Sequence, residues 1–149
     1  MDIELSVKLA IQASGLFLFV GMLTGVWKYW EIRNSEKHRA HYYVDVAHRT
    51  SLLYASACLI LAVLAYFSAW SAQVNLWLVL GNIVFFAVSV LSYIIHGVLK
   101  DTTNQFQVPH KVSRFHLPQP LMTLFMVALI VVELSCTLLL VVGVYKLFF

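Results

Sequence analysis

Long apolar runs, broken by short polar stretches, dominate the pattern of this chain. Four runs are long enough to cross a bilayer, since a transmembrane helix needs about 20 mostly apolar residues. They cover residues 7–30, 46–72, 74–98 and 117–145. The second and third runs lie so close in sequence that they must form an antiparallel helical hairpin, whereas the other two connections are longer and polar. The pattern therefore predicts an all-α fold, a four-transmembrane-helix bundle in which residues 1–149 form a single domain.

Composition supports the lipid bilayer as the solvent of this chain. Of its 149 residues, 61% are hydrophobic and only 11% are charged, and the mean hydropathy is +0.83. A soluble domain carries about 25% charged residues, so one aqueous core cannot hide this much apolar surface. The sequence also contains no nucleotide-binding loop, nucleophile triad or ion selectivity filter.

The basic residues predict an orientation. Only Lys8 and Lys146 lie at the ends of the spans away from the two long connections. Because cytoplasmic loops collect Lys and Arg, we expect a multi-pass protein of the cell (inner) membrane with both long loops cytoplasmic and both termini outside. This placement accounts for the net charge of +3 without a nucleic-acid partner. The other eight basic residues lie in or beside the long connections: Lys28, Arg33, Lys37, Arg39, Arg49, Lys100, Lys111 and Arg114.

Histidines gather at the same end of the predicted bundle. His48 begins the second span and His96 ends the third, so antiparallel packing should place the two at similar depth. One interpretation is that they contact lipid headgroups or loop carbonyls. Another is that both are axial ligands of one haem, as in a b cytochrome that carries electrons. All six histidines lie on this side: His38, His41, His48, His96, His110 and His116.

The third span carries a polar stripe. Asn82, Ser89, Tyr93 and His96 follow one another at i, i+7, i+11 and i+14, with Phe86 beside them. A polar stripe in a membrane helix should face the bundle or a partner subunit rather than lipid. Helix–helix hydrogen bonding and the lining of a ligand site are both open interpretations.

Glu133 lies near the middle of the fourth span and shares a face with Gln119, Met126 and Thr137. It is either a proton-handling or substrate-contacting group, or a protonated carboxyl bonded to a neighbouring helix. Because Glu133 and the Asn82 stripe need more burial than four helices easily provide, we expect the protein to self-associate.

The segment before the second span predicts a further site. Ser35 could cap a helix that runs straight into this span. On such a helix His41, Asp45 and His48 lie at i, i+4 and i+7, with His38 just before them. Two histidines and a carboxylate on one face can bind a transition metal. A non-haem metal site is therefore a separate hypothesis from the b cytochrome.

Several short motifs resemble the small four-helix membrane isomerases that include styrene oxide isomerase and hydroxylaminobenzene mutase. Gly21-Met22-Leu23-Thr24-Gly25 is similar to the Gly-Leu-Leu-Thr-Gly that closes the first span of the mutases. Ala47-His48 matches an Ala-His at the head of the second span in both groups. Asn82 matches a family asparagine, and Asn104-Gln105-Phe106 matches an Asn-Gln-Phe of the epoxide isomerase.

This resemblance implies a homotrimer in which His48 is the axial ligand of a haem b held between subunits. The ferric iron would act as a Lewis acid on a small apolar substrate, opening an epoxide to a carbonyl compound without redox turnover. By the same resemblance, arylhydroxylamines are the alternative substrate class.

The chain also departs from the family. Tyr54 stands where the isomerase has an asparagine, and Leu78 and Phe86 stand where it has an aspartate and a tyrosine. Tyr93, seven residues after Phe86, could supply a substitute hydroxyl. The candidate catalytic residues are thus Tyr93, Asn82 and Tyr54. A cofactor-free structural subunit of a membrane assembly is the remaining alternative.

Overall fold

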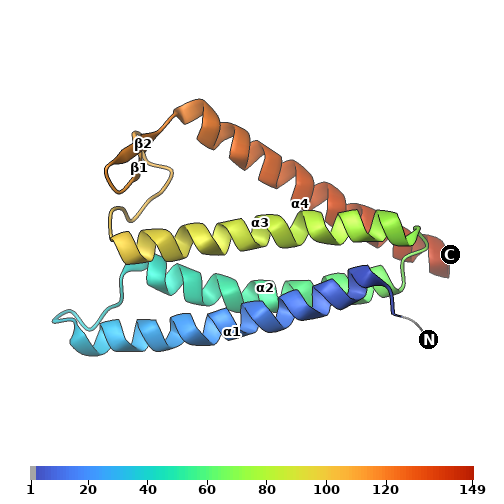
Figure 1. Ribbon diagram of the computed structural model, residues 1–149, viewed down its shortest axis with the longest axis horizontal. Coiled ribbons are helices and arrows are strands. Elements are labelled where there is room, and N and C mark those ends of the chain that lie inside the picture. The colour runs from blue at the N-terminus through green and yellow to red at the C-terminus, as the bar shows by residue number, and fades with distance from the viewer. Residues whose placement is uncertain (1–2) are drawn as a thin grey trace.

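The computed structural model describes residues 3–149, without the side chain of Lys111, and consists of four long helices and a small β-hairpin (Figure 1). The helices alternate in direction, so that both termini lie at one end, the terminal end, and both long connections at the other, the loop end. All four are long and apolar enough to span a membrane, which confirms the prediction of a multi-pass four-helix fold. The elements are α1 (Leu5–Asn34), α2 (Tyr42–Tyr66), α3 (Ala72–Leu99), β1 (His110–Val112), β2 (Phe115–Leu117) and α4 (Gln119–Phe148).

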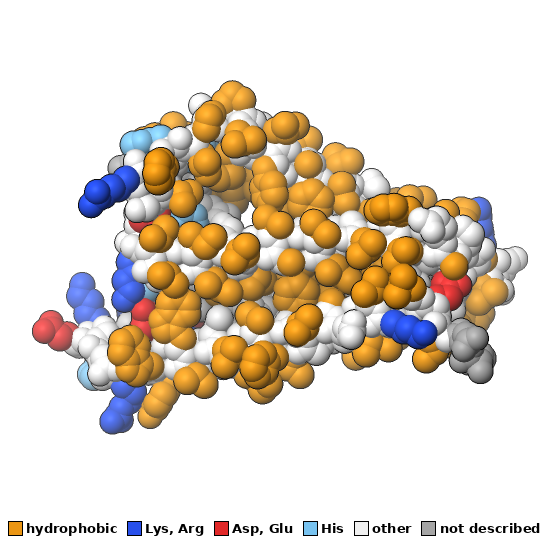
Figure 2. All heavy atoms as spheres, viewed as in Figure 1, with side chains coloured by type: hydrophobic (Ala, Val, Ile, Leu, Met, Phe, Trp, Pro, Cys, Tyr) orange, Lys and Arg blue, Asp and Glu red, His pale blue; other side chains and the backbone are white. Residues whose placement is uncertain are grey.

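The outer surface has the character expected of a protein in lipid. Hydrophobic side chains cover the flanks of the helices, while charged side chains gather at the two ends, chiefly the loop end (Figure 2). α4 is the extreme case, because only Leu140 and Gly143 of this helix are buried. Such a surface is stable against acyl chains or against another apolar protein surface.

Small residues let α1, α2 and α3 pack closely. Ala10 of α1 and Ala47 of α2 are completely buried. Cys58, eleven residues after Ala47 on the same face of α2, is completely buried as well. The hydroxyl of Ser14 donates to the carbonyl of Ala55 at 2.8 Å, which ties α1 to α2 directly. Close backbone approach through small residues is a common way for helices to associate in a membrane.

α4 is fastened to the other helices at its C-terminal end. A Cβ on Gly143 would collide with Ser68 and Trp70, so only glycine lets α4 approach the α2–α3 turn here. The Gly143 carbonyl accepts from the amide of Ala69 at 3.0 Å, and the indole N–H of Trp70 donates to the carbonyl of Leu139 at 2.7 Å. From this anchor α4 diverges from α3 towards the loop end, where the β-hairpin occupies the connection between them (Figure 1).

The helix boundaries differ from the prediction at both ends of α2. The expected helix from Ser35 into the second span is wrong: residues 35–41 are not helical, His38 has a φ of 49°, and His41 is the N-cap of α2. α2 ends at Tyr66, and Ser71 caps α3 by accepting from the amide of Val74. The β-hairpin after α3 was not predicted.

Candidate functional site

The imidazole of His48 rests on the glycine face of α1. Its Nδ1 lies 2.8 Å from the carbonyl oxygen of Gly21. Because a carbonyl only accepts, Nδ1 carries a hydrogen, and the neutral imidazole has its lone pair on Nε2. A Cβ on Gly25 would lie 2.9 Å from Cε1 of the ring, so glycine is needed for this ring position. The Gly21-to-Gly25 motif therefore sets both the position and the tautomer of His48.

The Nε2 atom of His48 has no hydrogen-bond partner within residues 3–149, and the side chain is only half-buried. A histidine whose Nδ1–H donates to a backbone carbonyl, with Nε2 left over, has the arrangement usual for a metal-ligating imidazole. His48 is thus oriented as a metal-binding imidazole would be.

Cations lie close to this imidazole on its loop side. Asp45, one turn before His48, is bridged by Lys28 at 2.6 Å and by Arg49 at 2.7 Å. Met22 directly follows Gly21 in α1, points to a different face of the helix, and is 54% exposed. His48 therefore sits at the junction of a charged rim and an exposed apolar flank.

The predicted metal triad is not brought together. His41 lies before α2, where its Nδ1 accepts from the amide of Tyr43 at 3.4 Å. Asp45 is occupied by its two cations. Within the described part of the chain, no three His, Cys, Asp or Glu side chains are grouped as a metal site. The triad required a helix that continued before Tyr42, and the chain is not helical there.

His96 is committed to the loop that follows α3. Its Nδ1 lies 2.8 Å from Oδ1 of Asp101, its side chain is 5% exposed, and its ring centroid lies 5.1 Å from that of Tyr43. His48, by contrast, packs on α1. The two histidines thus have separate partners, and nothing in these contacts directs them to a common ligand.

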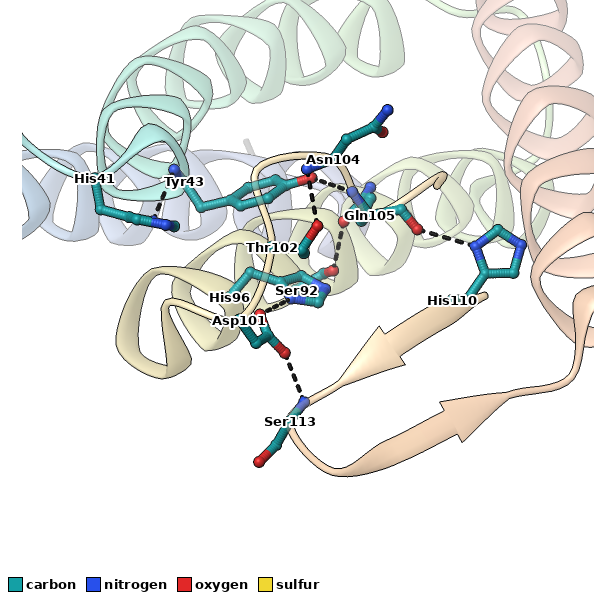
Figure 3. A network of polar contacts seen from close by, with 10 residues as sticks. All are labelled: His41, Tyr43, Ser92, His96, Asp101, Thr102, Asn104, Gln105, His110 and Ser113. Carbon is teal, nitrogen blue, oxygen red and sulfur yellow. Dashed lines mark hydrogen bonds and ion pairs between the residues drawn. The ribbon is translucent and has the colours of Figure 1, made fainter. Parts of the chain in front are cut away.

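Asp101 is the centre of a network that fastens the loop to the helices (Figure 3). Its second carboxylate oxygen accepts from the amide of Ser113 at 2.6 Å. Burial alone would raise the pKa of Asp101, but the hydrogen bonds from Ser113 and His96 outweigh it and hold the pKa below the ordinary value of 3.8. The carboxylate is therefore charged at neutral pH and joins the β-hairpin to the end of α3.

Gln105 is the second centre of this network. Its amide donates to the hydroxyl of Tyr43 at 2.5 Å, and its side-chain oxygen accepts from the hydroxyl of Ser92 at 3.0 Å. Its carbonyl lies 3.1 Å from Nδ1 of His110 (Figure 3). The sequence indicated Gln105 only as part of the Asn104-Gln105-Phe106 motif. Its contacts with α2 and α3 could not be predicted, because the sequence shows only that it lies in a polar segment between two apolar spans.

Asn82 joins two helices. It is completely buried; its amide group donates to the carbonyl of Leu78 at 3.0 Å, and its oxygen accepts from the hydroxyl of Thr137 on α4 at 3.1 Å. Of the two interpretations of the polar stripe, helix–helix hydrogen bonding is the one observed here. The four helices also bury Asn82 without help, so its burial no longer supports self-association.

A cavity of about 430 Å³ lies where α4 diverges from α3. Tyr54 and Tyr93, two of the three expected catalytic residues, line it, whereas Asn82 does not. The Tyr54 ring stacks on Phe86 at 4.1 Å and lies within hydrogen-bonding reach of Ser89. We call this space the α3–α4 pocket. Its walls are Tyr54, Val88, Ser89, Ser92, Tyr93, Gln105, Phe106, Leu121, Met122, Phe125, Met126 and Leu129.

Comparison with protein-family models, curated proteins and solved structures found no match for this chain. The resemblance to membrane isomerases therefore stays a prediction. What the structure shows is a four-helix, membrane-type fold in which His48 of α2 is oriented by a carbonyl of α1 and an apolar, tyrosine-lined pocket lies between α3 and α4.

Proposed function

We propose that this protein binds haem b through His48 and works in the membrane as an isomerase-like protein on a small apolar substrate of the epoxide or arylhydroxylamine class. The observation that carries the proposal is the hydrogen bond from Nδ1 of His48 to Gly21, which leaves Nε2 without a hydrogen-bond partner among residues 3–149. Both long loops are cytoplasmic in this proposal, because they hold most of the basic residues.

The residues around His48 fit a haem. Nε2 of His48 would bind the iron, whereas His96 is already paired with Asp101. Lys28 and Arg49 provide positive charge for propionates, and Met22 belongs to an apolar flank suited to a porphyrin. When bound, such a group would supply a Lewis acid for a substrate oxygen.

The chain's own residues would handle the substrate in the α3–α4 pocket. The hydroxyls of Tyr54 and Tyr93 can donate hydrogen bonds to a substrate oxygen, and the apolar walls exclude water. His48 packs on α1 and does not line this pocket, so the two sites are separate within one chain. A homo-oligomer would bring His48 of one copy to the pocket of another, and the exposed surface of α4 is available for that contact.

An absorption spectrum of the detergent-purified protein, before and after dithionite, tests the proposal. We expect a stoichiometric Soret band with single-histidine features, lost in His48→Ala. His116→Ala is the matched control, because His116 is an exposed histidine on β2, and it should keep the band. A normal Soret band in His48→Ala contradicts the proposal.

Two further results decide the chemistry. A low-spin spectrum that becomes high-spin in His96→Ala would favour the b cytochrome instead. If haem is retained as expected, epoxides and arylhydroxylamines are the first substrates to test, with Tyr93→Phe expected to slow turnover because it removes a hydroxyl and little volume.

A further inference from the structure

A carboxyl group with one buried oxygen lies one helical turn beyond the wall of the α3–α4 pocket. Glu133 lies near the middle of α4, and its Oε1 is inaccessible to solvent and without a hydrogen bond to any residue in the range 3–149. A buried acceptor of this kind is disfavoured unless something donates to it. Ionisable residues inside membrane segments usually have a function, so Glu133 is a candidate for contact with a ligand.

Glu133 belongs to the face of α4 that forms the pocket. Met122, Met126, Leu129 and Glu133 follow one another at i, i+4, i+7 and i+11, so they share one side of the helix. The first three line the pocket. Glu133 also lies close enough to Tyr54 and Tyr93 to interact electrostatically with both. Glu133 itself is not one of the residues that line the pocket, but it follows Leu129 by one helical turn on the same face of α4.

The other end of the pocket is closed by the loop. Gln105 and Phe106 form part of its wall, and the side chain of Gln105 is already bonded to Ser92. Tyr43 and His110 hold the Gln105 backbone in place (Figure 3). The loop therefore closes one end of the pocket, and the unbonded Oε1 of Glu133 lies beyond the other end.

The size and walls of the pocket restrict what can enter. A volume of about 430 Å³ falls in the lower part of the range of small-molecule pockets, about 300–1,000 Å³. Phe125, Met126 and Leu129 favour a hydrocarbon body, and flexible methionines adapt to its shape. The molecule must therefore be small and lipophilic, and it must carry a hydrogen-bond donor.

We propose that the α3–α4 pocket binds a small lipophilic amine whose ammonium group donates to Glu133. Charge-assisted hydrogen bonds to a carboxylate are about twice as strong as neutral ones, which favours an amine over an alcohol. The rings of Tyr54 and Tyr93 add favourable cation–π surfaces for an ammonium group. This site does not depend on haem, because His48 packs on α1 and does not line the pocket.

Isothermal titration calorimetry of the protein in lipid nanodiscs, with empty nanodiscs subtracted, tests the site. The probes are 4-phenylbutylamine, 4-phenylbutanol and butylbenzene, which share a body and differ in the head. We expect saturable binding of the amine, about tenfold or more tighter than the alcohol or hydrocarbon and about tenfold or more weaker in Glu133→Gln. Ser135→Ala, an exposed site on the same helix, should bind the amine like the wild type.

Leu129→Trp provides an independent variant, since it fills the pocket and keeps Glu133; it should weaken the amine at least as much. Equal amine affinity in wild type and Glu133→Gln, equal affinity for amine and alcohol, or no heat above empty nanodiscs overturns the proposal. If Glu133→Gln does not fold, unchanged binding in Leu129→Trp overturns it. His48→Ala should still bind the amine, so failure of haem binding and failure of this site are distinguished.

Discussion

Two glycines on one face of α1 have different roles in placing His48. The carbonyl of Gly21 orients the imidazole, and a Cβ at this position would meet mainly the movable side chain of Leu52. A Cβ at Gly25 would meet the imidazole itself. At the residue scale, the small-residue motif is thus more than a packing surface, because one glycine supplies an acceptor and the other supplies space.

Gly25→Ala should displace the ring of His48 and reduce haem retention, whereas Gly21→Ala should reduce it less because the carbonyl remains. Overpacking of this kind costs about 1–3 kcal/mol. The measurement is the Soret absorbance per mole of protein, with the melting temperature as a control for general destabilisation. Equal haem content in Gly25→Ala and wild type would contradict this role of Gly25.

The Asn82–Thr137 hydrogen bond should contribute a small, measurable coupling between α3 and α4. Hydrogen bonds between membrane helices average about 0.6 kcal/mol. A double-mutant cycle with Asn82→Ala and Thr137→Ala, read from unfolding in mixed micelles, should give a coupling energy of this size. Asn82→Ala alone should cost more, because it also leaves a cavity at a completely buried position. Strict additivity of the two variants would argue against the bond.

At the scale of elements, the connection between α3 and α4, residues 100–118, is bonded to the helices at several points, and we call it the strap. Asp101 joins His96 to Ser113, and Gln105 joins Tyr43 to Ser92. These contacts draw the β-hairpin side of the loop onto the ends of α2 and α3. Because Gln105 also borders the α3–α4 pocket, loss of the strap should loosen the pocket as well.

The strap should resist pH change until the solution is acidic. The folded-state pKa of Asp101 lies below 3.8, so its stabilising contribution is complete above that value and is lost as the pH falls through the lower, folded pKa. The protection factor of the Ser113 amide, which is its exchange rate corrected for the intrinsic pH dependence of exchange, should therefore fall only in acid. In Asp101→Asn the protection factor should already be lower at neutral pH, and its acid-dependent step should disappear. A wild-type step near neutral pH would contradict this assignment.

For the whole molecule, attachment at one end explains both the pocket and the exposed fourth helix. Gly143 fixes α4 to the α2–α3 turn, and the hairpin connection separates α4 from α3 at the loop end. α4 consequently buries little of its surface in one chain. That surface is left for lipid or for a further copy of the chain.

The proposed orientation predicts which end reagents reach in intact cells. In a variant with Cys58 and Cys136 replaced by alanine, Ser113→Cys at the loop end should resist an impermeant maleimide and react after permeabilisation. Ile3→Cys at the terminal end should react in both cases. Ser113 is an exposed hairpin residue and Ile3 is exposed as well, so accessibility is matched. The reverse labelling pattern would invert the orientation.

The sequence by itself determined the four helices and the short α2–α3 turn. Lipid leaves few choices, because long apolar segments must satisfy their backbone groups internally as helices. Two positions of the predicted catalytic set, Tyr54 and Tyr93, also reached one pocket, because both belong to inward faces of neighbouring helices.

Only the tertiary structure decided the partners of the polar groups. The sequence placed His41, His96 and Asn82 near candidate sites, but their bonds are to Tyr43, Asp101 and Thr137 respectively. These pairings depend on where helices end, how loops fold back and how far α4 tilts. Such features arise from contacts between distant segments, so periodicity within one helix cannot specify them.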